Sequence, residues 1–346
     1  MSGVNRRIAA VAGALLALGL VLVATPVALA HEGDSLPAPT VLTFLFDWGF
    51  DPTLWVPAIA TLALWLWGVR RANRAHPDRP VAMSRTLFFV AGVAVLLVAL
   101  DSAVGLYDDT LLSDHMVQHL LLTLIAPPLL LLGGPVTLAL QAASPGFRRR
   151  WILPVLHSRV LRQLGRPVVA WLLFAGILWG THFSPIYELS LENNWIHDGE
   201  HLLYVGSALL FWLPVIRRNP APWRLSPAAS VLYVGLQAPQ MTFLALAIFM
   251  APEPLYAHYA NAVRTWGPTA LADQQLAGGI MWVGGDLVFF VIGLLLVIAW
   301  MQDEERGAAR VDRQLDAARA RALEAAGSAL SAGQPSGGTE APRYSR

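Results

Sequence analysis

Long apolar runs separated by short polar segments dominate the chain. Each run has roughly the 17 to 25 residues that an α-helix needs to cross a bilayer. The runs show no strand-like alternation, and lipid offers no hydrogen-bond partner to an open backbone. The pattern therefore predicts an all-α polytopic membrane protein, a seven-helix bundle with spans near residues 53–69, 86–106, 115–133, 167–183, 195–216, 227–250 and 275–300.

Charge is distributed unevenly between the loops, although the net charge of the 346 residues is only +1. Arginines fill alternate loops, as in residues 70–85, 148–166 and 217–224, whereas acids occupy the loops between them. By the positive-inside rule the arginine-rich loops are cytoplasmic. We therefore expect a bacterial plasma-membrane protein with its N-terminus outside, its C-terminus in the cytoplasm, and a lipid bilayer but no nucleic acid around it.

Both ends of the chain differ from the predicted membrane domain, which covers residues 31–301. Residues 1–30 resemble a signal peptide, because Arg6 and Arg7 precede an apolar stretch that ends in Ala28-x-Ala30. An uncleaved extra span is the alternative. Residues 302–346 turn polar and predict a cytoplasmic tail, helical to about residue 326 and disordered beyond it.

Four histidines form two H-x-x-x-H pairs at the predicted outer ends of two spans. The pairs are His115 with His119 and His197 with His201, and His182 lies at the outer end of a third span. Histidines four residues apart share a helix face, where two imidazoles can converge on one ion. One such pair alone is often an ordinary interfacial feature, so the hypothesis of a metal site depends on both pairs together.

The absence of cysteine limits the chemistry of that site. Without thiolates, a metal must be held by imidazole, carboxylate or thioether groups. Imidazole with thioether points to copper, and Met241 is the candidate thioether ligand. Because only neutral imidazole binds a metal, affinity should fall as the pH drops through about 6 to 6.5.

Four carboxylates complete the list of candidates. Asp101, Asp114 and Asp273 lie near the outer face, where each could orient a histidine; Asp114 and Asp273 could equally be helix caps. Asp286 falls near the middle of the last span, where a carboxylate indicates a proton or cation path or a bond to a neighbouring helix.

Residues 197–201, HDGEH, also match the H-x-x-E-H signature of zinc peptidases. Five residues with two wildcards are weak evidence, and the sequence offers no clear third ligand or substrate cleft. We therefore do not predict an enzyme.

A long motif gives the chain a family likeness. Residues 114–135, DHMVQHLLLTLIAPPLLLLGGP, resemble the signature of the CtaG family of bacterial cytochrome c oxidase assembly factors. The likeness extends over about residues 45–300, through Phe50-Asp-Pro52, the HDGEH segment, Phe211-Trp-Leu-Pro214 and residues 273–282, DQQLAGGIMW.

The resemblance implies a role in maturing the oxidase, with oxidase subunits as partners and copper as the metal handled. It does not identify the copper ligands, which are inferred here from histidine spacing and sidedness. Two other function classes stay open: a transporter of a metal cation or proton that uses Asp286, and a haem-binding redox protein. Haem is the weaker of these, because haem ligands for transmembrane electron transfer would lie at both leaflets, whereas these histidines gather at one.

Overall fold

The computed structural model describes residues 36–332, so the proposed signal peptide lies outside the described residues. Within this range the chain is helical, with a single isolated bridge between Trp48 and Ser102 as its β-type pairing. The all-α class is thus confirmed. Contacts cluster the chain into two units, residues 1–293 and 294–346, which are treated separately below.

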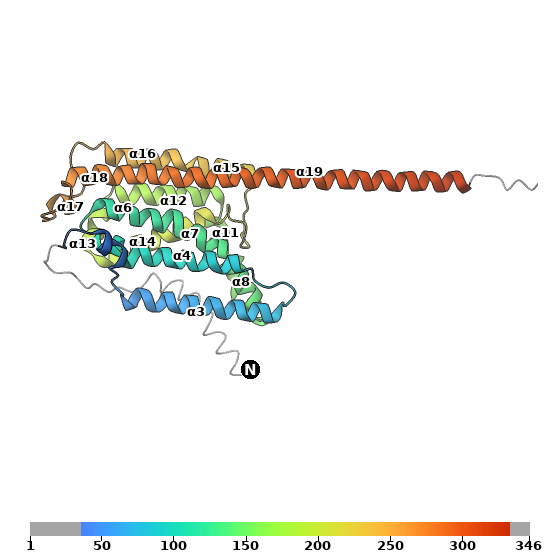
Figure 1. The fold of residues 1–346 in the computed structure, drawn as a ribbon, viewed down its shortest axis with the longest axis horizontal. Helices are drawn as coiled ribbons and strands as arrows, with labels where there is room; N and C mark the ends of the chain where they lie inside the picture. Colours follow the sequence, from blue (N-terminus) through green and yellow to red (C-terminus); the bar gives the residue numbers. More distant parts are fainter. Residues whose placement is uncertain (1–35, 333–346) are drawn as a thin grey trace, which may run out of the picture. The chain divides into compact units, whose positions relative to one another are not determined.

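The long helices of the first unit run side by side as a bundle (Figure 1). Its principal helices are α3 (Pro52–Ala75), α4 (Met83–Asp101), α6 (Leu112–Leu120), α7 (Ala126–Gly133), α12 (Pro167–His182), α14 (Asn194–Trp212), α15 (Pro227–Gly235), α16 (Gln237–Phe249), α18 (Ala270–Gly279) and the start of α19 (Gly285–Ala332). Shorter helices connect them: α2 (Val41–Phe46), α5 (Ala103–Tyr107), α8 (Pro135–Ala142), α9 (Pro145–Phe147), α10 (Leu153–Leu156), α11 (Arg159–Leu164), α13 (Pro185–Glu192) and α17 (Ala257–Asn261).

Five helical stretches among the described residues are long and apolar enough to cross a membrane. A sixth is added if α12 and α13, which meet at a bend of 70°, count as one span. The segment missing from the predicted seven is α14, whose first turns carry histidines and acids in place of apolar residues. These criteria do not confirm the count of seven.

Apolar side chains on the outside of the bundle agree with a lipid environment. Leu232, Phe243 and Phe290 are each more than half exposed. In water such a surface would be unfavourable, whereas lipid solvates it at no cost.

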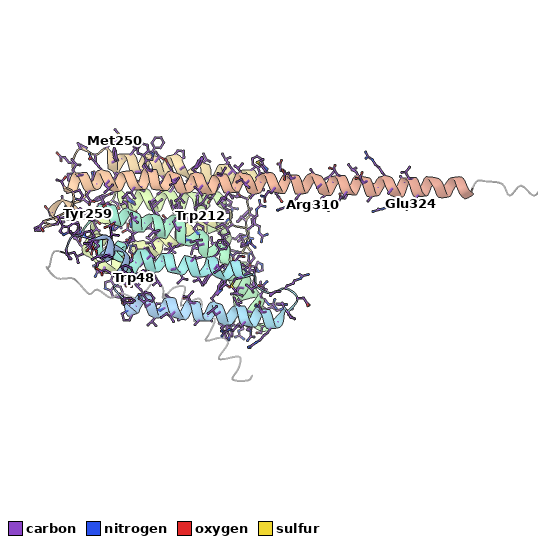
Figure 2. The ribbon with its side chains drawn as sticks, viewed as in Figure 1. Trp48, Trp212, Met250, Tyr259, Arg310 and Glu324 are labelled. Carbon is purple, nitrogen blue, oxygen red and sulfur yellow. The ribbon has the colours of Figure 1, made fainter. Side chains whose placement is uncertain are left out.

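The third span contains a π-helical turn directly after its histidine pair. Three π-helical turns lie in the described chain, and the first of them, η1 (Leu121–Ile125), follows α6; the others are η2 (Arg148–Ile152) and η3 (Ile280–Gly284). Pro127 has no N–H, so it cannot donate to the carbonyl of Thr123. The indole N–H of Trp212 donates to that carbonyl instead, at 3.1 Å. This hydrogen bond therefore ties η1, directly after α6, to the end of α14 (Trp212 is labelled in Figure 2).

The second unit contains the remainder of α19. The helix runs to Ala332, and nearly all of its described side chains beyond residue 301, including Arg310 and Glu324, are exposed (Figure 2). A polar, exposed helix buries no apolar face, so this unit has no core of its own.

Candidate metal centre

The two histidine pairs lie on two parallel helices. Asn193 caps the start of α14 by accepting the backbone N–H of Trp195 at 3.0 Å. The ring centroids of His115 and His119 are 4.2 Å apart on α6, and those of His197 and His201 are 4.3 Å apart on α14. Each pair therefore occupies one face of its helix, as its spacing predicts.

The two faces are turned toward each other. The His115 and His197 rings stack with centroids 5.4 Å apart, and His119 and His201 lie 6.4 Å apart. His182, from the end of α12, lies 5.7 Å from His119. We call these five residues the histidine chamber.

The chamber leaves several buried nitrogens without a hydrogen-bond partner. His115, His119 and His182 are at most 4% exposed. The unpartnered atoms are Nε2 of His115, both ring nitrogens of His119, Nε2 of His182 and Nε2 of His197. Buried polar atoms without partners are rare, because each costs about 1 to 3 kcal/mol. Several of them converging in one place are characteristic of a ligand site.

Hydrogen bonds outside the chamber fix which nitrogen of two histidines is free. The Tyr259 hydroxyl donates to the carbonyl of Asp108 at 2.6 Å, so its oxygen must accept from Nδ1 of His115 at 3.2 Å. Nδ1 of His182 donates to the carbonyl of Leu178 at 2.7 Å. In both rings Nε2 is then the unprotonated nitrogen, the form that binds a metal.

His201 is oriented by a third contact. The Gln118 amide N–H donates to the Asp108 carboxylate at 2.7 Å and to the Ala99 carbonyl at 3.1 Å. The Gln118 carbonyl therefore accepts from Nε2 of His201, at 2.9 Å. This contact leaves Nδ1 as the unprotonated nitrogen of His201.

Two carboxylates join the histidines. Potential ligand atoms of His115, His119 and Glu200 all lie within 4.8 Å of one another, as do those of Asp108, His115 and His197. One oxygen of Glu200 accepts from the Tyr204 hydroxyl at 2.8 Å, and the other has no partner. Both carboxylates are buried, and neither forms an ion pair among the described residues.

Asp108 lies in the turn before α6, outside the predicted spans. Burial raises the pKa of the Asp108 carboxyl well above its ordinary value, and the negative charge of Asp109 raises it further. A bound cation would act in the opposite direction and favour the carboxylate form.

Asp101 and Asp114 have other surroundings. Asp101 accepts the backbone N–H of Phe50 at 3.0 Å and that of Asp51 at 3.1 Å, and the indole N–H of Trp55. It anchors the segment before α3, and its hydrogen-bond partners include no histidine. Asp114 is half-buried on α6, one residue before His115.

Asp273 is a buried cap of the helix that carries the first histidine pair. Its carboxylate accepts the backbone N–H of Leu112 at 2.8 Å and the Ser113 hydroxyl at 2.6 Å, and Arg264 lies 3.7 Å away. A carboxylate at a helix N-terminus stabilises that end. Asp273 therefore positions α6, and through it both histidines.

Met241 and Asp286 both lie where α16 packs against the start of α19. The Met241 thioether packs against Gly285, with its sulfur 3.4 Å from where a Cβ would lie. The Asp286 carboxylate accepts from the Thr242 hydroxyl at 3.0 and 2.9 Å. Asp286 thus forms a hydrogen bond to a neighbouring helix, which the sequence analysis gave as the alternative to a proton or cation path.

A comparison with protein families gives the chain a family. The model of the cytochrome c oxidase caa3 assembly factors matches residues 63–303. The chain belongs to this family. The match covers both histidine pairs, His182 and Glu200, so the chamber lies wholly inside the family domain. The family description names assembly and not catalysis.

Curated relatives share the domain within longer chains. Uncharacterized proteins of Mycobacterium leprae and Mycobacterium bovis are each 30% identical to this chain. The alignments cover 82% of this chain but 44% of either relative, so the chain spans less than half of their length. No solved structure matches the chain significantly.

Four residues of the site were not among the sequence candidates: Glu200, Asp108, Gln118 and Tyr259. Glu200 left a signal, because its place three residues after His197 puts it on the histidine face of α14. Gln118 is also three residues from His115. Asp108 and Tyr259 come from loops and a short helix, whose approach to α6 no local pattern predicts.

Proposed function

We propose that the protein binds copper in the histidine chamber and passes it to a cytochrome c oxidase subunit during assembly. The observation that carries the proposal is the convergence of five imidazoles from three helices, with buried nitrogens that have no partner inside the protein. Copper is cargo in this proposal and not a resident cofactor.

The chemistry of the donors supports copper. Imidazole nitrogen is a good ligand for copper and zinc, and the affinity of a given site for divalent metals is highest for copper. No thiolate, the ligand that selects Cu(I), is present. A site of imidazoles and carboxylates is therefore suited to binding an ion that must later leave.

The predicted sidedness supports a handover at the outer membrane face. Both pairs begin within the first turns of their helices, at the end of the bundle where α13 and α17 lie (Figure 1). The arginine-rich loops of the sequence belong to the opposite ends of the spans. An oxidase subunit in the same bilayer would meet the chamber without the ion crossing the lipid core.

The test measures copper in the oxidase of cells that carry variants of this protein. His115→Ala with His119→Ala removes two imidazoles of one helix. We expect the purified variant to lose bound copper and the oxidase to lose copper loading, with the amount of variant in the membrane unchanged.

The matched control is His76→Ala with His157→Ala, because both histidines are exposed and lie outside the chamber. This pair should leave copper content and oxidase loading at the wild-type level. Normal loading in cells with the chamber variant would reject copper delivery and leave a scaffolding role for the family domain.

A further inference from the structure

Histidines of the chamber and the two neighbouring carboxylates form two overlapping sets of ligands that share one histidine. An outer set consists of Asp108, His115 and His197, and an inner set of His115, His119 and Glu200. Resting on the proposed function, we propose that the chamber holds a single divalent ion, which moves between these two sets by exchanging partners around His115.

The two sets are stacked along the helices. His119 follows His115, and Glu200 follows His197, by about one helical turn, which is roughly 4.5 to 6 Å along the axis. Because α6 and α14 run in parallel, these steps go in the same direction from the ends of the helices. An ion that moves from the outer to the inner set therefore goes deeper by about one turn while it stays bound to His115.

Occupation by one ion follows from the hydrogen bonds of His115. Its Nδ1 donates to Tyr259, so Nε2 is the single nitrogen that can bind a metal. A neutral imidazole nitrogen has one lone pair, so two ions cannot both use it. An ion bound in either set occupies Nε2 of His115, so the other set loses that ligand. The two sets are therefore alternative positions for one ion.

Charge favours a divalent ion over Cu(I). Each set pairs neutral imidazoles with one buried carboxylate that has no cationic partner among the described residues. Thiolate, which selects Cu(I), is absent from both sets because the chain has no cysteine. A divalent ion offsets the buried carboxylate and matches the nitrogen and oxygen donors.

The outer set adjoins a cavity that could supply the ion. This cavity has a volume of about 1070 Å³, and its lining has one arginine, Arg264, against five acids, Asp51, Asp101, Asp109, Glu188 and Glu192. Asp109 directly follows Asp108, and Asn194, also in the lining, lies one turn before His197. The acidic wall therefore raises the local cation concentration beside the outer set and makes that set the entrance.

The test titrates the purified full chain in detergent with Cu(II) and records metal content and electron paramagnetic resonance spectra. Wild type should bind one ion per chain and show two spectral components. Asp108→Asn removes the outer carboxylate, so the component of the inner set should remain. Glu200→Gln should leave the other component, and the double variant should bind at least about tenfold more weakly.

The control is His76→Ala, which should reproduce the wild-type spectrum. Two ions per chain, a single component in wild type, or complete loss of binding in either single variant would overturn the exchange between sets. Binding of Cu(I) without Cu(II) would overturn the divalent assignment. Failure of wild type to bind any metal would instead reject the proposed function. The wild-type component count needs no variant, so the exchange is tested even if a variant does not fold.

Discussion

Two groups of buried polar side chains, one toward each end of the bundle, are hydrogen-bonded in opposite ways. Near α8, the Arg85 guanidinium donates to the carbonyls of Gly133 and Gly134, at 2.8 and 3.0 Å. Asn219 there is fully buried and donates to the Leu131 carbonyl at 2.9 Å. At the other end, His119 is buried with neither ring nitrogen bonded. The first group satisfies itself and builds structure, whereas the converging imidazoles of the second leave ring nitrogens for a ligand from outside.

The sharpest test of this contrast is His119→Ala. Its imidazole faces His115, Tyr204 and His182 but donates and accepts no hydrogen bond inside the protein. We expect copper affinity to fall by at least about 100-fold, since a direct ligand counts for more than a residue that only orients one. Isothermal titration or competition with a copper chelator measures the change.

The same variant should leave the metal-free protein folded, with a thermal midpoint close to that of wild type. Unchanged copper affinity would exclude His119 as a ligand and remove the inner set. His157→Ala, an exposed histidine, is the control for general effects of losing an imidazole.

Asn219→Ala should give the opposite result. The side chain amide also accepts the backbone N–H of Val136 at 3.1 Å, so its removal leaves a donor and an acceptor buried without partners. We expect a loss of about 2 kcal/mol or more in the free energy of unfolding, with no change in copper affinity per folded molecule. Thermal unfolding in detergent and a copper titration give the two quantities.

A stable Asn219→Ala protein would contradict the contrast at its structural end. A loss of copper affinity in the folded fraction would show instead that the two ends depend on each other.

Tyr259→Phe tests the orientation of His115 with a smaller effect. The variant removes the oxygen that accepts from Nδ1 of His115 and the hydroxyl that donates to Asp108. Both ring tautomers of His115 then become accessible, so copper affinity should fall by about tenfold. Tyr233→Phe is the matched control, because its buried hydroxyl has no hydrogen-bond partner.

An affinity equal to wild type would mean that packing alone orients His115. Copper binding would then depend on Nε2 of His115 alone, and the hydrogen bond from Nδ1 to Tyr259 would contribute nothing to it.

The apolar runs of the sequence predict much of the fold but less of the candidate metal site. The predicted span at residues 53–69 begins within one residue of α3, because Pro52 marks the helix start in the sequence. The segment at 195–216 forms α14, but its polar first turns place it below the hydropathy of a membrane span. The same residues that make α14 a poor span make it part of the chamber.

The histidines were predictable from their spacing, since residues four apart on a helix share a face whatever the tertiary structure. Spacing also places Glu200 on the histidine face of α14, but it does not predict His182. The approach of His182 depends on how α12 packs on α14, which spacing does not encode. Asp101 shows the same limit: it binds the backbone at Phe50 and Asp51, and only the folded loop brings that backbone within reach.

Asp286→Asn is expected to have the smallest effect and separates copper handling from transport. The Thr242 hydroxyl donates to the Asp286 carboxylate, and an asparagine carbonyl can accept the same bond. Asp286 therefore belongs with the satisfied polar groups, although it lies in the last span. Copper binding and oxidase loading should match wild type, and stability should change by no more than about 0.5 kcal/mol. Copper or proton uptake into vesicles that requires Asp286 would instead identify this carboxylate as part of a transport path. A hydrogen bond inside the protein would then no longer indicate that a buried polar group in this bundle is purely structural.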